Sequence, residues 1–288
     1  MSKEYVAGIS IGSRQSQLAL FEVRDQKHLL LYVEVHDQND ESPFWFMRGI
    51  EHSSKLFKKI SKISVAVDSS SVTFHTFPLD TSLTQKEQQD HIHWELSNII
   101  ADYQPQNYVT DIHVLKSHVR DQTAEILTVA VQRQYILEIQ RFIAGMGLKV
   151  GLIDTVYFAS EYALLANYPE IKTKCVALVV MNNDRVDIGW YMNGRLTRYM
   201  STSGVDIENA IQKIQSGRYE FFVSEVFYCA QMNLIEKLRV KHKELRIPMT
   251  VVDPMRRLVK TSMWRTSRVK NGRDYLLAAC AGIALQSR

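Results

Sequence analysis

The sequence predicts an α/β protein built from two related halves, and three observations support this prediction. Apolar and polar residues alternate over residues 5–12, 17–24 and 28–35, which is typical of three antiparallel strands joined by tight turns. The same three-strand pattern returns at 175–201, with Asn193-Gly194 as a type I′ hairpin turn. Helical patterns and further strands follow each set, which indicates an internal duplication.

Helix signals mark three segments of the first half. Ser42 before Pro43 is a predicted helix start, Thr84 with Glu87 forms a capping box, and Gly147 is a helix stop. The predicted elements of this half are a helix at 41–60, strands at 63–68 and 72–79, a helix at 81–103, strands at 108–119 and 124–131, a helix at 134–146, a strand at 149–154 and a helix at 156–168. Those beyond 175–201 are helices around 205–215 and 231–245, a strand at 249–253 and a helix at 274–287.

The bulk composition excludes several classes of protein. The chain has 288 residues, enough for two lobes with a core, and its formal net charge of +4 is too small to indicate nucleic-acid binding. Cys175, Cys229 and Cys280 lie far apart in apolar runs, which predicts reduced core thiols in a cytosolic protein. No signal-peptide pattern opens the chain, and its apolar runs are too short to span a membrane. We therefore expect a cytoplasmic protein.

Several stretches resemble one family in the order in which they occur. GISIGSRQSQLALFEV at 8–23 matches a first phosphate hairpin of the actin-like ATPase superfold, and ALVVMNNDRVDIGWYMNGRL at 177–196 matches the second. Between them, residues 125–164 match a strand–helix–strand–helix unit. Within that superfold the sequence resembles the type IV pilus assembly protein PilM family over nearly the whole chain. The resemblance implies an actin-like, ribonuclease H-like α/β fold of duplicated lobes with an inserted α+β subdomain.

The resemblance also implies domain boundaries. Residues 1–78 and 146–170 would form a discontinuous first core lobe, and residues 79–145 the inserted subdomain. Residues 171–288 would form a second core lobe that is truncated, because residues 205–227 leave too little chain for most of the subdomain that covers the nucleotide in the family.

In the family, two hairpins and a glycine-rich turn hold ATP and magnesium, and this sequence departs from the pattern at each. Ser10 stands where a metal-associated Asp is expected, although Gly12 and Ser13 keep the turn. Asn182 stands at the glycine of the second hairpin, and the adenosine-binding turn falls near Phe227–Gln231, without glycine. We therefore expect Ser10, Gly12, Ser13 and Asn182 to form vestigial phosphate hairpins, with neither ATP nor magnesium as a cofactor.

Two alternatives stay open. One is an active actin-like ATPase with a rearranged nucleotide site. A shifted register would bring Asp184 or Asp187 near the second hairpin, but each would then lie in the wrong part of the turn. The other alternative is the actin-like cytoplasmic component of a type II secretion platform, whose known form carries a membrane span that this sequence does not show.

The resemblance implies a scaffold with no catalytic residue and no metal site. Its partner would be the cytoplasmic N-terminal tail of an inner-membrane PilN-like protein, held in a groove between the first lobe and the inserted subdomain. Other components of the pilus platform or motor would be partners too, and the protein would be cytoplasmic and peripheral to the inner membrane. The predicted partner-binding residues are Trp94, Ile99, Val131, Arg133 and Tyr135.

Three further features of the sequence could have either a structural or a functional role. Trp94 is either a partner anchor or a core residue. His91 and His93 point about 200° apart on a helix, so they are expected to be surface residues that share no metal. The segment 256–273 has seven Lys or Arg and no Asp or Glu. It would either contact the anionic inner leaflet or form a solvated loop.

Overall fold

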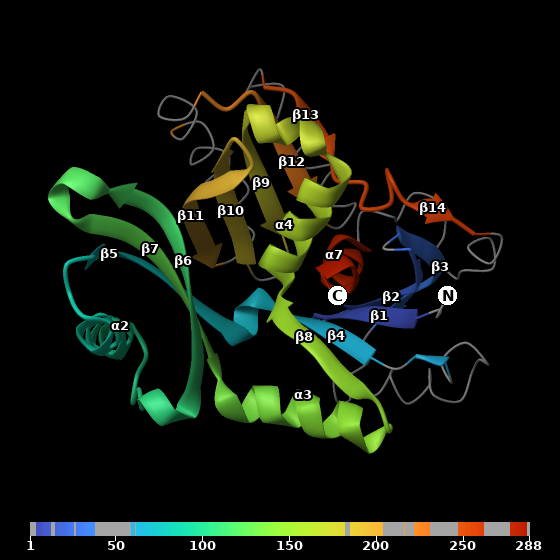
Figure 1. Cartoon of the computed structure of the whole chain (residues 1–288), viewed down its shortest axis with the longest axis horizontal. Coiled ribbons are helices and arrows are strands. Elements are labelled where there is room, and N and C mark those ends of the chain that lie inside the picture. Colours follow the sequence, from blue (N-terminus) through green and yellow to red (C-terminus); the bar gives the residue numbers. More distant parts are fainter. Residues whose placement is uncertain are drawn as a thin grey trace.

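The computed structural model describes residues 4–12, 15–25, 27–37, 59–60, 62–181, 185–203, 216, 222–230, 247–261 and 277–286. The helices predicted at 205–215 and 231–245 lie outside these ranges, as does the helix at 41–60 except for its last two residues. Figure 1 shows two large sheets with helices between them and a small sheet that projects to one side.

The first large sheet has the strand order β14-β3-β2-β1-β4-β8. Strands β1, β2 and β3 pair in antiparallel fashion, whereas β4 and β8 run parallel to β1. The strands are β1 (Glu4–Ile11), β2 (Gln15–Arg24), β3 (Lys27–Asp37), β4 (Lys62–Val67), β8 (Lys149–Thr155) and β14 (Val259–Lys260).

The second large sheet repeats this order as β11-β10-β9-β12-β13. Its first three strands are antiparallel, and β12 and β13 are parallel to β9, so each sheet is a meander extended by two parallel strands. Asn193 and Gly194 have φ angles of 53° and 76°, as a type I′ turn requires. The predicted duplication is therefore confirmed. The strands are β9 (Cys175–Met181), β10 (Arg185–Met192), β11 (Arg195–Ser203), β12 (Glu225–Cys229) and β13 (Met249–Val251).

The small sheet has the order β5-β7-β6, and helix α2 packs on one face of it. Ile92 and Leu96 of α2 (Gln85–Ile99) are buried there. The predicted capping box is present, because the Thr84 N–H donates to Glu87 Oε2 at 2.8 Å and the Glu87 N–H donates to Thr84 Oγ1 at 3.4 Å. The strands are β5 (Val72–Asp80), β6 (Tyr108–His118) and β7 (Thr123–Gln132).

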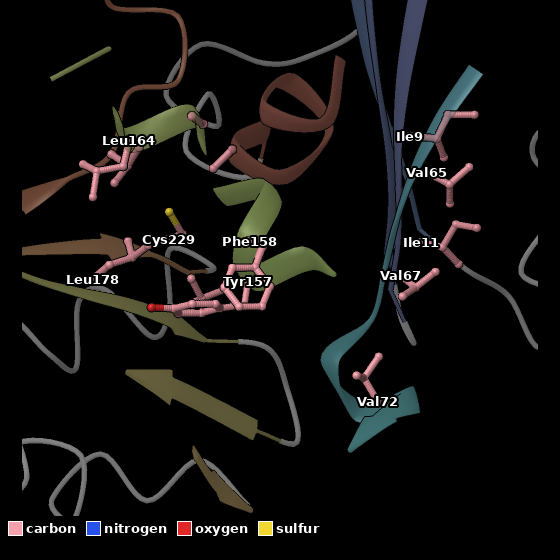
Figure 2. Close-up of a cluster of buried hydrophobic side chains, with 14 of the residues drawn as sticks. Ile9, Ile11, Val65, Val67, Val72, Tyr157, Phe158, Leu164, Leu178 and Cys229 are labelled. Carbon is pink, nitrogen blue, oxygen red and sulfur yellow. The ribbon is translucent and has the colours of Figure 1, made fainter. Parts of the chain in front are cut away.

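Helix α3 (Arg133–Gly145) leads from the small sheet back to the first large sheet, where Ile139 and Ile143 are buried. Helices α4 (Val156–Asn167) and α7 (Ala278–Gln286) lie between the two large sheets (Figure 1). Figure 2 shows how one apolar cluster crosses the junction, from Ile9 and Val65 of the first sheet through Phe158 of α4 to Leu178 of the second. The described residues of both lobes therefore share a continuous core.

The two C-terminal elements require a correction of the predicted second lobe at 171–288. Strand β14 pairs with β3, and α7 buries its apolar residues against β1 and β2. Strand β14 is therefore part of the first sheet, and α7 packs on that sheet, since an apolar helix must bury its surface against another element. The start of the insert also differs, because all of β5, from Val72, pairs within the small sheet.

The cysteine prediction is confirmed for two of three residues. All three are free thiols, and Cys229 and Cys280 are buried. Cys175, however, is only half-buried, since it begins strand β9 at the margin of the core.

We expect Gly282→Ala to destabilise the protein by about 2 kcal/mol, because an added methyl group would overpack the α4–α7 contact. A Cβ atom at Gly282 would lie 1.8 Å from the carbonyl oxygen of Ala159, so the two helices would have to separate. Urea unfolding measures the change in the free energy of unfolding. Gly145→Ala is the matched control, because no atom of the described residues beyond its own helical turn lies within 4 Å of its Cβ position. Equal stability of the two variants would contradict this account of the contact.

Candidate functional site at the junction of the two lobes

The first hairpin keeps the turn that its sequence predicts. Ser10 is buried in β1, and the Gly12 N–H donates to the Gln15 carbonyl at 3.0 Å. A Cβ atom at Gly12 would lie 2.8 Å from that carbonyl oxygen, so a larger residue would disturb the turn. Ser13 lies outside the described residues. The hairpin shape is thus retained, while Ser10 supplies a hydroxyl group where a carboxylate is expected.

Two carboxylates that the sequence analysis missed lie at the same edge of the first sheet. Asp68 follows β4, and its Oδ2 atom lies 3.7 Å from the Cβ position of Gly12. Asp154 lies in β8, in register with Ala66 of β4, which is itself in register with Ser10. Burial raises the pKa of Asp154 to about 6, although the Thr155 N–H donates to its carboxylate at 2.7 Å. The signal available in the sequence was an Asp at the end of each of two parallel strands.

The second hairpin is described only at its two ends. Asn182 and Asp184 lie outside the described residues. Asp187 does not lie in the turn, as the shifted register would require, because it is a buried residue of β10. Asp187 is buried together with its neighbours Val186 and Ile188, so the shifted register does not bring its carboxylate to the turn.

The predicted adenosine-binding turn near Phe227–Gln231 also requires a correction. Phe227 and Tyr228 are buried within strand β12, which pairs with both β9 and β13. The strand ends at Cys229, so any turn begins at Ala230, and Gln231 lies outside the described residues.

Arg185, at the start of β10, makes polar contacts that reach from the second lobe to the first. Its Nε atom donates to Asp187 Oδ1 at 2.7 Å, and its Nη2 atom donates to the Tyr199 hydroxyl at 3.0 Å. Its Nη1 atom crosses to the other lobe and donates to the carbonyl oxygens of Ser69 at 3.0 Å and Val72 at 3.2 Å. Burial lowers the pKa of Arg185, but the charges of Asp187 and Tyr199 outweigh it and raise the pKa above its usual value.

A cluster of aromatic rings lies beside the guanidinium group of Arg185, on the side of the small sheet. The guanidinium carbon of Arg185 lies 4.7 Å from the centre of the Phe74 ring, which stacks on Tyr199 at 5.0 Å. On α4, Tyr157 meets Tyr199 edge to face at 5.0 Å, and Phe158 stacks on His113 of β6 at 4.1 Å. The first lobe, the insert and the second lobe therefore meet in one aromatic cluster.

A second polar group lies along α4. The hydroxyl groups of Tyr157 and Tyr191 are 2.7 Å apart, and Glu161 hydrogen bonds with Tyr191. Burial raises the pKa of Glu161 to about 8, and the charge of Asp154 raises it further, while the bond to Tyr191 lowers it. Glu161 is thus predominantly protonated at neutral pH.

The five predicted partner-binding residues fall into two groups. Trp94 is 60% exposed and Ile99 is 44% exposed on α2, so the interpretation of Trp94 as a core residue is wrong. Arg133 is exposed as well and lines a pocket of about 470 Å³ between α3 and the turn at 105–107. Val131 and Tyr135, by contrast, are half-buried and pack against the main core, and burial raises the pKa of Tyr135 to about 12. Their role in binding stays a prediction.

The described part of the chain shows no metal site formed by His, Cys, Asp or Glu side chains. His91 lies 3.5 Å from Glu95, whereas His93 Nδ1 lies 2.8 Å from the Tyr103 hydroxyl, so the two histidines have different partners. In the basic segment 256–273, only residues 256–261 are described, and Arg256 forms an ion pair with Glu170. Among the described helices, none has both the length and the apolar character to cross a membrane.

Two sheets that share a three-stranded meander followed by two parallel strands, with helices between them, define the actin-like ATPase fold, and solved structures confirm it. The chain is similar to a chain of the PilM–PilN type IV pilus biogenesis complex, with a TM-score of 0.75, 13% identity and 98% of both chains covered. A Bacteroides thetaiotaomicron protein with an actin-like ATPase fold and unknown function has a TM-score of 0.56 and 11% identity, with 88% of this chain and 92% of that chain covered. The ethanolamine utilization protein EutJ from Carboxydothermus hydrogenoformans has a TM-score of 0.51 and 10% identity, with coverage of 99% and 90%. No protein-family model matches the sequence, and no curated protein matches it.

We expect stability to fall as the pH rises through the raised pKa of Glu161. Because the folded state holds a proton up to about pH 8 that the unfolded chain releases near pH 4.5, this contribution is complete below pH 4.5 and disappears by about pH 8. Asp154 adds a similar loss that ends near pH 6. The window between pH 6 and 8 therefore separates Glu161 from Asp154, with a slope on the order of 1 kcal/mol per pH unit. Burial lowers the pKa of His113, which acts in the opposite direction and only up to the ordinary value of 6.5.

Glu161→Gln should flatten this slope, because an amide group does not titrate. Urea unfolding at several pH values between 6 and 8 measures it. Glu138→Gln, on the exposed face of α3, is the control for the amide substitution. A slope in Glu161→Gln as steep as in the wild type would refute the assignment.

Proposed function

We propose that this protein is a PilM-like scaffold in the inner-membrane assembly platform of a type IV pilus system. It binds the cytoplasmic tail of a PilN-like membrane protein and does not hydrolyse ATP. The observation that carries the proposal is the similarity to a chain of the PilM–PilN complex over 98% of both chains. On this proposal the protein is cytoplasmic and peripheral to the inner membrane, in contact with further platform or motor components.

The absence of ATP hydrolysis is supported by the chemistry of the first hairpin. A magnesium ion bound to a triphosphate requires hard oxygen ligands, and carboxylates are the usual ones. Ser10 places a buried neutral hydroxyl group at the position where the family has a carboxylate. The residues that are described at the first hairpin therefore do not fit the family's way of holding a magnesium-bound nucleotide.

Isothermal titration with Mg-ATP tests this part of the proposal. We expect no heat of binding at micromolar nucleotide and no release of phosphate above the buffer rate. Binding in the micromolar range would overturn the proposed loss of the nucleotide site.

The active ATPase remains a second candidate because Asp68 and Asp154 lie at the same sheet edge as Gly12. If the titration detects Mg-ATP, Asp68→Asn and Asp154→Asn should each weaken it at least tenfold, since both remove a candidate ligand of the cation. Asp80→Asn is a matched control, because Asp80 is exposed at the far end of β5. Full binding by both junction variants would eliminate this rearranged site.

Tail binding is supported by the exposed apolar surface of the insert and by its position next to the first lobe. An exposed Trp is a favoured anchor at interfaces, and Arg133 is already oriented by hydrogen bonds to the carbonyl oxygens of Gln106 at 2.8 Å and Tyr108 at 3.1 Å. Both side chains project from stable elements, so their replacement should leave the fold intact.

Trp94→Ala and Arg133→Ala should each weaken binding of the tail by about tenfold or more, which is typical of interface anchors. The measurement is fluorescence anisotropy with a labelled peptide of the tail of a PilN-like protein from the same genome. Val119→Ala is the control, because Val119 is an exposed apolar residue at the opposite end of the insert. Capture of a secretion-platform protein rather than a pilus protein in a pull-down from host lysate would favour the type II secretion alternative.

A further inference from the structure

The inserted subdomain leaves the first lobe through a short connection at residues 68–72. Strand β4 ends at Val67, a single 3₁₀ turn covers Ser69–Ser71, and β5 begins at Val72. The turn is closed locally, because the Ser70 N–H donates to Asp68 Oδ1 at 2.9 Å and the Ser71 N–H donates to the Asp68 carbonyl at 3.0 Å. A further bond ties the start of β5 to the turn, because the Val72 N–H donates to the Ser69 carbonyl oxygen.

Arg185 of the second lobe binds this connection at both of its ends. One nitrogen, Nη1, donates to the carbonyl oxygen of Ser69 and to that of Val72, which are the first residue of the turn and the first residue of β5. The same guanidinium group lies over the ring of Phe74, two residues further along β5. A side chain of the second lobe therefore contacts both the connection and the first residues of the insert.

The guanidinium group is itself held in place by two residues of the second lobe. Asp187 accepts from Arg185 Nε and also accepts from the Tyr199 hydroxyl at 2.5 Å, and Tyr199 accepts from Arg185 Nη2. The side chains of Arg185 and Asp187 are 15% and 2% exposed, so water does not compete effectively for these bonds. A planar cation that makes four such hydrogen bonds has a single preferred orientation.

We propose that Arg185 is a clamp between the lobes, which fixes the connection at 68–72 and so couples the orientation of the inserted subdomain to the second lobe. Asp187 and Tyr199 are positioning residues that aim the guanidinium group. As a consequence, any movement of β10 in the second lobe moves the insert and its exposed surface. This coupling requires no nucleotide between the lobes.

Distance measurements by double electron–electron resonance test the clamp in the intact chain. Spin labels at Val119→Cys, on the insert, and Lys172→Cys, next to the second sheet, report their separation, with the half-buried Cys175 replaced by Ser. We expect one narrow distance distribution in the labelled protein that retains Arg185. In Arg185→Met the distribution should be at least twice as wide. Arg185→Lys should be intermediate, because an ammonium group keeps the charge but cannot reach all four acceptors at once.

Arg256→Met is the matched control. Arg256 also forms an ion pair with a carboxylate and lies over an aromatic ring, Tyr168, at 4.5 Å, but it does not contact the connection at 68–72. Its distance distribution should match that of the wild type. Widening in Arg256→Met equal to that in Arg185→Met would overturn the proposal, since the loss of a cation that does not contact the connection would then have the same effect.

Tyr199→Phe keeps the experiment decisive if Arg185→Met does not fold, because it removes one hydroxyl group and leaves the ring in place. Hydrogen exchange at the Ser70 and Ser71 amides should be at least tenfold faster in Tyr199→Phe and in Arg185→Lys than in the wild type. Unchanged exchange together with unchanged distances in both variants would overturn the clamp.

Discussion

The close contact between α4 and α7 is the constraint on which the rest of the structure depends. Gly282 lets α7 approach the carbonyl of Ala159, and Gly8 lets β1 approach the carbonyl of Cys280, so the helix pair fits between the two large sheets. Small residues at such points allow backbone-to-backbone packing that larger side chains would prevent. Because α4 carries Tyr157 and Phe158 into the junction, the position of this helix pair also sets the position of the aromatic cluster.

The elements that depend on local patterns are the ones that sequence reasoning predicts well. Alternation along both meanders, the Asn193-Gly194 turn and the Thr84–Glu87 capping box are properties of neighbouring residues, and each is present in the structure. The contacts of Arg185 were not predictable in this way. Its acceptors on Ser69 and Val72 lie more than a hundred residues away along the chain, and a carbonyl oxygen has no signature in the sequence.

The candidate site could be predicted only in part, because some of its residues come from distant parts of the chain. Gly12 and Ser10 are read directly from the first hairpin, but the sequence does not show that Asp68 lies beside that hairpin, because parallel strands meet only after the chain has crossed over. The face that a helical residue presents is equally hidden, and Trp94 was therefore ambiguous between core and surface. The insert's small sheet offers α2 only one face to cover, which leaves Trp94 exposed.

The return of α7 to the first sheet has a consequence for synthesis on the ribosome. The face of β1 and β2 that bears Val6 and Phe21 is buried by residues 277–285. These residues leave the ribosome long after the two strands do. At elongation rates of about 5–20 residues per second the delay is on the order of tens of seconds. Throughout that interval the nascent first lobe exposes an apolar surface, so chaperone binding during translation is an expected part of the life of this chain.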